Sequence, residues 1–160
     1  MCSSDLDARR LERAGLPAVQ ITTGQACHLD AAMVGRGLDA LEAAGHALAS
    51  LDLLFIENVG NLVCPAAFDL GEHLRLVLLS VSEGEDKPLK YPAMFHRADL
   101  VAMSKCDLAA AVDFDRALAI RNLRQAAPRA RVVDTSARSG AGLQELLEAL
   151  LPAAVPLKAG

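Results

Sequence analysis

A carboxylate, an amide and a thiol follow one apolar run in the middle of the chain. The run covers residues 53–56, and the polar groups after it belong to Glu57, Asn58 and Cys64, with a glycine at Gly60. Four consecutive apolar residues are too few for a helix and are typical of a strand buried on both faces. In open α/β sheets, binding and catalytic groups lie beyond the carboxyl ends of such strands. We therefore expect a functional site to begin at Glu57.

A lysine and an aspartate follow another apolar run, at residues 100–103. The tetrapeptide Ser104-Lys105-Cys106-Asp107 has the form of the guanine-reading loop of G proteins, usually Asn-Lys-x-Asp, with serine in the asparagine place. A carboxylate there can accept hydrogen bonds from the N1 and N2 donors of guanine, and a lysine stem can lie over the base. Four residues alone are explained more simply as a solvated strand end.

A second loop strengthens the interpretation that the chain binds guanine. Residues 135–140, Thr-Ser-Ala-Arg-Ser-Gly, also follow a predicted strand and resemble the Ser-Ala-x loop with which G proteins support guanine through backbone groups. The order and separation of the two loops fit that class of protein. Together they provide five candidate nucleotide-binding residues: Ser104, Lys105, Asp107, Ser136 and Ala137.

Glu57 and Gly60 are the candidate catalytic residues. The stretch Glu-Asn-Val-Gly at 57–60 is similar to the Asp-x-x-Gly switch of G proteins, with glutamate in place of aspartate. In that switch the glycine N–H faces the γ-phosphate and the acid holds the Mg²⁺ shell through water. Asp7 is a further candidate for an acid that approaches Mg²⁺, although an aspartate near the start of a helix is commonly explained by the helix dipole.

Three longer motifs resemble the hydrogenase nickel-incorporation GTPases, the HypB family. They are Thr-Gly-Gln-Ala-Cys-His-Leu-Asp at 23–30, Phe-Ile-Glu-Asn-Val-Gly-Asn-Leu-Val-Cys-Pro at 55–65 and Glu-Gly-Glu-Asp-Lys-Pro-Leu-Lys-Tyr-Pro at 83–92. The last two favour the hydrogenase type over the related urease-type nickel GTPases. The resemblance extends over residues 7–151. It implies a G domain that binds GTP and Mg²⁺ and serves nickel delivery.

The resemblance also implies a metal site formed by Cys27, His28 and Cys64. Thiolate and imidazole are suitable ligands for Ni²⁺ and for Zn²⁺, so both metals stay open. Cys64 lies just beyond the switch residue Gly60, so nucleotide state could move a metal ligand. Three ligands leave the metal shell incomplete, and the family places this site at a two-fold interface, so a homodimer is expected. The remaining cysteines and histidines are interpreted as ordinary core or surface residues: Cys2, Cys106, His46, His73 and His96.

The phosphate-binding motif of P-loop GTPases, G-x-x-x-x-G-K-S/T, does not occur in the sequence. Its backbone N–H groups cradle the phosphates and its lysine neutralises their charge. The lysines of this chain, at positions 87, 90, 105 and 158, are not preceded by glycine. We therefore expect the chain to be the C-terminal part of a longer protein, or a reading frame with a misplaced start, with the first strand and P-loop upstream.

The predicted elements alternate between strand and helix, which indicates an α/β fold with a mainly parallel sheet. The expected class is a P-loop NTPase-like G domain that lacks its first strand and P-loop. Strands are predicted at 53–56, 74–81, 100–103 and 131–135, with a short β-prone run at 18–22. Helices are predicted at 5–14, 27–44, 113–127 and 143–151. Residues 1–151 are expected to form one incomplete G domain and residues 152–160 a flexible tail.

Some details of these elements are also predicted. The last helix should bury a leucine stripe at the spacing i, i+3, i+4, i+7, formed by Leu143, Leu146, Leu147 and Leu150. Asp113 is the expected N-cap of the helix before it. The charged segment 82–92, with its two prolines, fits a solvated connection and a dimer contact near the nucleotide equally well.

Composition narrows the classes of function. The 160 residues are 52% apolar and 22% charged, as in an ordinary globular domain. A net charge of −4 and 3% aromatic residues argue against nucleic-acid binding. The sequence shows neither a continuous apolar membrane span nor an apolar signal core near its start, so a cytoplasmic chain is expected. Four cysteines without a C-x-x-C pair argue against a disulfide framework.

The sequence supports three interpretations of function. The first is a GTP-controlled nickel-binding metallochaperone for NiFe-hydrogenase maturation, in which the intact protein hydrolyses GTP to drive nickel delivery. Its expected partners are the hydrogenase large-subunit maturation machinery and a nickel-transfer chaperone. The second is a metal-binding dimerisation module without GTPase activity, because the P-loop is absent. The third, a small α/β hydrolase or transferase with Cys64 as nucleophile, is weak because Pro65 follows where a nucleophile elbow needs glycine.

Overall fold

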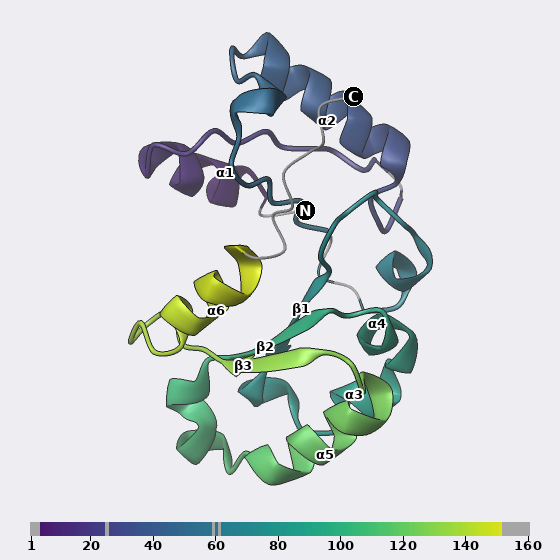
Figure 1. Ribbon diagram of the computed structural model, residues 1–160, viewed down its shortest axis with the longest axis vertical. Helices are drawn as coiled ribbons and strands as arrows, with labels where there is room; N and C mark the ends of the chain where they lie inside the picture. Colours follow the sequence, from purple (N-terminus) through teal and green to yellow (C-terminus); the bar gives the residue numbers. More distant parts are fainter. Residues whose placement is uncertain (1–3, 25, 59, 61, 152–160) are drawn as a thin grey trace. The chain divides into compact units, whose positions relative to one another are not determined.

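Figure 1 shows the computed structural model of the chain, which describes residues 4–24, 26–58, 60 and 62–151. The chain divides into two compact units, called the first unit (Met1–Gly71) and the second unit (Glu72–Gly160). One incomplete G domain over residues 1–151 remains a prediction, and the tail predicted at 152–160 lies outside the described residues. No helix in the described ranges is long and apolar enough to cross a membrane.

The second unit contains a parallel sheet of three strands. They are β1 (Leu76–Ser80), β2 (Leu100–Ser104) and β3 (Arg131–Asp134), in that order across the sheet. Because all three strands run in the same direction and in register, their carboxyl ends lie at one edge of the sheet. The predicted α/β class with a parallel sheet is confirmed. The loops that follow β2 and β3 therefore start next to each other.

Helices cover both faces of this sheet. Figure 1 shows α5 (Arg116–Ala126) on the opposite side of the strands from α6 (Leu143–Leu150). Two short helices, α3 (Lys87–Lys90) and α4 (Pro92–His96), pack against α5. The core of the unit comes from the strands and from the helices on the α5 side, and its largest fully buried apolar side chains are Phe95, Leu79, Leu100, Met103, Leu123, Val101 and Val133. The central strand β2 is buried from Leu100 to Met103, as its continuous apolar run predicts, whereas Leu78 of β1 is 60% exposed.

The segment 82–92 is more ordered than its sequence predicts. Where the sequence indicates a loop, the chain forms α3 and the start of α4. Two hydrogen bonds join the segment to α5: the Glu85 side chain accepts from the Asp115 N–H at 2.6 Å, and the Glu85 carbonyl accepts from Asn122 Nδ2 at 2.9 Å. Asn122 is buried, so its amide needs this partner. The segment is thus packed on its own unit, and a dimer contact there remains a prediction.

The last two helices differ from their predictions in detail. The N-cap of α5 is Asp115, whose Oδ1 accepts from the Leu118 N–H at 2.9 Å, whereas Asp113 lies in a left-handed turn with φ 50°. The predicted cap at Asp113 is therefore wrong by two residues. The apolar stripe of α6 is also less buried than expected, since Leu143 and Leu147 are 41% and 44% exposed.

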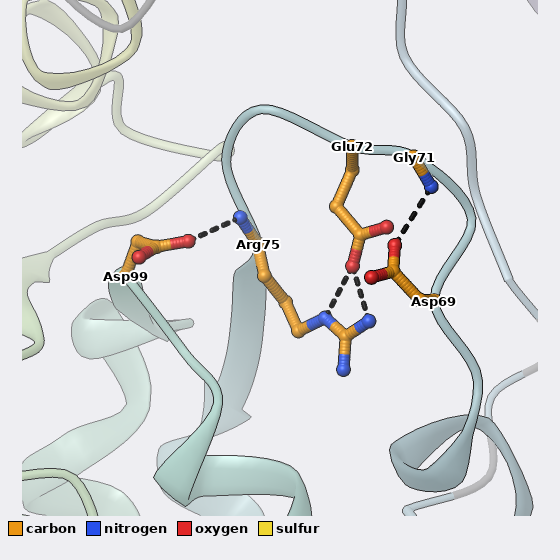
Figure 2. A network of polar contacts seen from close by, with 5 residues as sticks. All are labelled: Asp69, Gly71, Glu72, Arg75 and Asp99. Carbon is orange, nitrogen blue, oxygen red and sulfur yellow. Dashed lines mark hydrogen bonds and ion pairs between the residues drawn. The ribbon is translucent and has the colours of Figure 1, made fainter.

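A charged network holds the amino end of the sheet (Figure 2). The Arg75 guanidinium binds Glu72, with Nε 2.6 Å from Oε1, and both side chains are largely buried. The Arg75 N–H donates to Asp99 Oδ2 at 2.8 Å, while the Arg75 carbonyl accepts from the Asp99 N–H at 3.0 Å. These contacts fix the starts of β1 and β2 at the end of the sheet away from the candidate nucleotide loops. In the first unit, Asp69 Oδ1 accepts from the Gly71 N–H at 2.9 Å.

The regular secondary structure described in the first unit is helical. It contains α1 (Ser4–Arg13), α2 (Ala31–Ala43), and the short 3-10 helices η1 (Leu48–Ser50) and η2 (Cys64–Ala67). The sequence predicts helix from residue 27, but α2 begins after Asp30, whose Oδ1 accepts from the Met33 N–H at 2.7 Å. Residues 27–30 therefore remain outside the helix.

Glycine within α2 allows close packing. Gly37 is buried, and a Cβ at this position would lie 2.7 Å from Ile21 Cδ1. Ile21 belongs to the segment 18–22 that was predicted as β-prone; it lies against the helix here, and the segment forms no strand. Val34 is the other buried residue of α2, whereas Ala32 is exposed.

The predicted strand at residues 53–56 is wrong. In the described part of the first unit, these residues form no strand, and Phe55 is 67% exposed. A strand needs a neighbouring strand to satisfy its backbone N–H and C=O groups. The unit offers no such partner among the residues that the structure describes. An apolar run is therefore insufficient to make this segment a strand.

Candidate functional site

The first unit brings Cys27, His28 and Cys64 together. Their potential ligand atoms, two Sγ atoms and an imidazole nitrogen, all lie within 4.8 Å of one another. Cys27 is exposed, and the other two side chains are half-buried. This spacing is short enough for the three groups to contact one metal ion.

Two elements position these ligands. Cys64 is the first residue of η2, and the next two residues, Pro65 and Ala66, are buried and anchor that short helix. Cys27 and His28 lie in the segment that precedes the capped start of α2. The segment with Cys27 and His28 meets the segment before η2 through a contact between Leu29 and Asn58, which are 29 positions apart in the sequence.

Two contacts hold the segments together. Asn58 Oδ1 accepts a hydrogen bond from the Leu29 N–H at 3.0 Å, and Leu29 is buried. The ring of Phe68, directly after η2, stacks on the ring of His28 with the centroids 3.8 Å apart and the planes inclined by 20°. Phe68 was not predicted as a site residue, and the spacing of residues along the chain carries no signal for it.

The electrostatics of the three side chains favour a soft cation. A hydrogen bond with Cys64 raises the pKa of the Cys27 thiol, and slight desolvation and the charge of Cys64 act in the same direction. The Cys27 sulfur lies 3.7 Å from His28 Nδ1. Two thiols this close cannot both ionise without repulsion unless a cation neutralises them. The donor set, two sulfurs and one imidazole, fits Ni²⁺ or Zn²⁺ and leaves at least one coordination position for another ligand.

The second unit joins the two candidate nucleotide loops. The Cys106 N–H donates to the Thr135 carbonyl at 3.0 Å, and the Thr135 N–H donates to the Met103 carbonyl at 2.7 Å. The hydroxyl of Ser136, which is 1% exposed, donates to Asp107 Oδ1 at 2.6 Å. The loop after β3 thus orients the carboxylate of the loop after β2.

The other nucleotide candidates lie around this junction. Ser104 ends β2, and Lys105 follows in a left-handed conformation with φ 60°. Lys105 and Ala137 are exposed. The Cys106 thiol donates to the Met103 carbonyl at 3.0 Å, and partial burial raises the pKa of this thiol. Cys106 therefore packs as an ordinary half-buried residue, in agreement with its interpretation from sequence.

The loop after β3 closes on a glycine that sequence reasoning missed. The Ser136 N–H donates to the Ala141 carbonyl at 2.9 Å, and the Gly140 N–H donates back to the Ser136 carbonyl at 2.9 Å. Gly142 follows with φ 69°, and a Cβ on it would lie 1.8 Å from the Asp134 carbonyl oxygen. No residue with a side chain fits there without moving the backbone. The Gly-Ala-Gly sequence at 140–142 was the available signal.

Asp7, Glu57 and Gly60, the remaining predicted site residues, lie in the first unit and are not members of its cluster of Cys27, His28 and Cys64. Asp7 lies on α1 and pairs with Arg10, with 3.1 Å between Oδ1 and Nη1, and its approach to Mg²⁺ remains a prediction. Glu57 is exposed in the first unit, as is Gly60, whose neighbours Val59 and Asn61 lie outside the described residues. The catalytic role of Glu57 and Gly60 remains a prediction.

Comparison with known proteins identifies the family of this chain. Residues 1–134 match the family model described as CobW/HypB/UreG, nucleotide-binding domain. The hydrogenase maturation factor HypB of Azotobacter vinelandii is 56% identical over 149 residues, which cover 90% of this chain and 46% of that protein. The chain thus spans about half the length of the curated relatives it matches.

Two solved structures have the same fold. HypB from Helicobacter pylori in complex with nickel matches with a TM-score of 0.88 and 42% identity, over 92% of this chain and 68% of that chain. The hydrogenase maturation factor HypB from Archaeoglobus fulgidus matches with a TM-score of 0.83 and 38% identity, over 96% of this chain and 72% of that chain.

Proposed function

The chain belongs to the CobW/HypB/UreG family of nucleotide-binding domains and is of the HypB type, and from this premise we propose that it serves as a GTP-controlled nickel metallochaperone in NiFe-hydrogenase maturation. The observation that carries the proposal is the cluster of Cys27, His28 and Cys64. It occurs in a chain whose solved relative at 42% identity was crystallised with nickel.

Nickel is the cargo in this proposal. The thiolates of Cys27 and Cys64 and the imidazole of His28 bind Ni²⁺, and binding releases the thiol protons. Zn²⁺ can occupy the same donors. Because three donors leave the shell incomplete, we infer that two copies of the chain form a homodimer and complete it together. The expected recipients are a nickel-transfer chaperone and the hydrogenase large-subunit maturation machinery, and the expected compartment is the cytoplasm.

GTP is the proposed control. Asp107, oriented by Ser136, reads the guanine N1 and N2 donors, with Ser104, Lys105 and Ala137 around the base. Glu57 holds Mg²⁺ through water, and the Gly60 N–H faces the γ-phosphate. Cys64 lies four positions after Gly60, so a switch that responds to hydrolysis could displace one nickel ligand. Hydrolysis in the intact protein would in this way be linked to nickel release.

A second candidate function is a metal-binding dimerisation module without GTPase activity. The observation that favours it is the absence of the G-x-x-x-x-G-K-S/T motif from these 160 residues. Phosphoryl transfer depends almost entirely on positioning and charge stabilisation of the phosphates, which that motif supplies. Nickel binding is common to both candidates, whereas nucleotide turnover separates them.

Nickel binding is expected of the reduced chain by itself. In equilibrium dialysis, the wild-type chain should take up Ni²⁺ saturably, to no more than one ion per chain, with a thiolate-to-nickel charge-transfer band in the near ultraviolet. Zn²⁺ should displace the ion and abolish the band, since it accepts the same ligands. Ni²⁺ uptake without a thiolate band would place the metal elsewhere and contradict the proposed site.

Nucleotide turnover by this chain is expected to be negligible. Without the phosphate cradle, the 160-residue chain should bind GTP weakly and hydrolyse it at least about 100-fold more slowly than a G domain that contains the motif. Phosphate release and fluorescent guanine-nucleotide titration measure the two quantities. Asp107→Ala should remove any preference for GTP over ATP. Turnover at the rate of an intact G domain would overturn this expectation and exclude the module without GTPase activity.

A further inference from the structure

The ring of Phe68, which is not a metal ligand, covers one face of the His28 imidazole. Phe68 lies parallel to His28 within 20°, with 3.8 Å between the ring centroids. A metal ion binds an imidazole nitrogen at the edge of the ring, in the ring plane. A stack on the face therefore restricts rotation of the ring without itself blocking either nitrogen.

Phe68 and Cys64 belong to the same short element. Cys64 is the first residue of η2, and Phe68 is its C-cap, whose N–H donates to the Pro65 carbonyl at 3.3 Å. Pro65 and Ala66 are buried, which anchors the element in the first unit. The element thus carries one candidate ligand itself and, through Phe68, contacts a second one from a distant part of the chain.

The backbone next to His28 is held independently of this stack. Asn58 Oδ1 accepts from the Leu29 N–H at 3.0 Å, and Leu29 is buried. This contact limits movement of the main chain that carries Cys27 and His28, but it leaves the side-chain torsions of the histidine free. The terminal torsion of histidine is intrinsically broad. The stack with Phe68 restrains this torsion, together with the 3.7 Å contact between His28 Nδ1 and the Cys27 sulfur.

We propose that Phe68 is a positioning residue of the nickel site: its ring holds the His28 imidazole in the orientation in which Nδ1 faces the Cys27 sulfur, and it does so from the helix that carries Cys64. The proposal rests on the nickel site proposed above. Outer-shell residues that orient a metal-binding histidine commonly change metal affinity by about 10–100-fold when they are replaced. Movement of η2 would then shift Cys64 and loosen His28 together, so two of three donors would respond to one element.

The test compares two substitutions at this position. Phe68→Leu keeps an apolar side chain without a ring, and Phe68→Tyr keeps the ring as a matched control. Ni²⁺ affinity, measured by competition with a chromophoric chelator, should fall about tenfold in Phe68→Leu and stay within about twofold in Phe68→Tyr. In metal-free samples, NMR should show that the ring-current shift of the His28 ring protons is lost in Phe68→Leu and kept in Phe68→Tyr.

A double-mutant cycle separates positioning from a general structural role. In a His28→Ala background, Phe68→Leu should cause no further loss of Ni²⁺ affinity, because the ring it orients is absent. An equal loss in both backgrounds, or wild-type affinity in Phe68→Leu, would overturn the proposal. If His28→Ala binds Ni²⁺ as tightly as the wild type, the proposed ligand set is itself wrong, and the role of Phe68 falls with it. A thermal unfolding curve for each variant identifies losses caused by misfolding.

Discussion

Replacing Gly142 with alanine is expected to destabilise the second unit by about 3 kcal/mol or more. Gly142 has φ 69°, and the added Cβ would lie 1.8 Å from the carbonyl oxygen of Asp134, a backbone atom at the end of β3. A backbone neighbour cannot move aside as a flexible side chain can. The loop would have to open and lose the hydrogen bond between the Ser136 N–H and the Ala141 carbonyl.

Gly140→Ala is the matched control for this prediction. Gly140 lies in the same loop with φ 80°, but nothing lies within 4 Å of a Cβ placed there. Gly140→Ala should lower the free energy of unfolding by about 1–2 kcal/mol, which is the cost of placing alanine in a left-handed conformation. Urea unfolding of both variants, followed by circular dichroism, measures the difference. Equal destabilisation by the two substitutions would show that contact with Asp134 does not determine the role of Gly142.

Cys64→Ala is expected to weaken Ni²⁺ binding by about 100-fold or more, beyond the 10–100-fold typical of outer-shell changes. The substitution removes one of three donors whose atoms lie within 4.8 Å of one another. Cys27 and His28 then remain, which provide one sulfur and one imidazole nitrogen instead of the full set of three donors. The variant should lose the thiolate charge-transfer intensity that Cys64 contributes.

Cys106→Ser is the control for Cys64→Ala. Cys106 lies in the second unit, where its thiol donates to the Met103 carbonyl at 3.0 Å. Serine can make the same hydrogen bond, so Ni²⁺ affinity should be unchanged. Chelator competition and the increase of melting temperature on adding Ni²⁺ give two independent measurements, since a ligand that binds the folded state raises its stability. Full metal stoichiometry and affinity in Cys64→Ala would remove Cys64 from the site.

Much of the candidate site could be predicted from residue types in short motifs. Cys27, His28 and Cys64 were selected through the resemblance to the HypB family, and the two nucleotide loops through their G-protein-like motifs after apolar runs. What the motifs could not reveal were the residues that act through contact alone. Phe68 is chemically inert, and its stack on His28 depends on where η2 lies in the folded unit. Gly142 is one glycine among eleven until the approach of Asp134 is known.

The three strands of the parallel sheet and the approximate extent of the long helices could be predicted from the amino-acid sequence, because each follows a local pattern of apolar residues. The tertiary structure alone decided the outcome at residues 53–56, where an equally apolar run has no partner strand in the described part of its unit. It also decided how the metal ligands meet, through the contact between Asn58 and Leu29 and the stack of Phe68 on His28. The physical reason is the same in both cases. Backbone pairing and ring stacking depend on groups that are distant in sequence, and a local pattern does not specify which of them become neighbours.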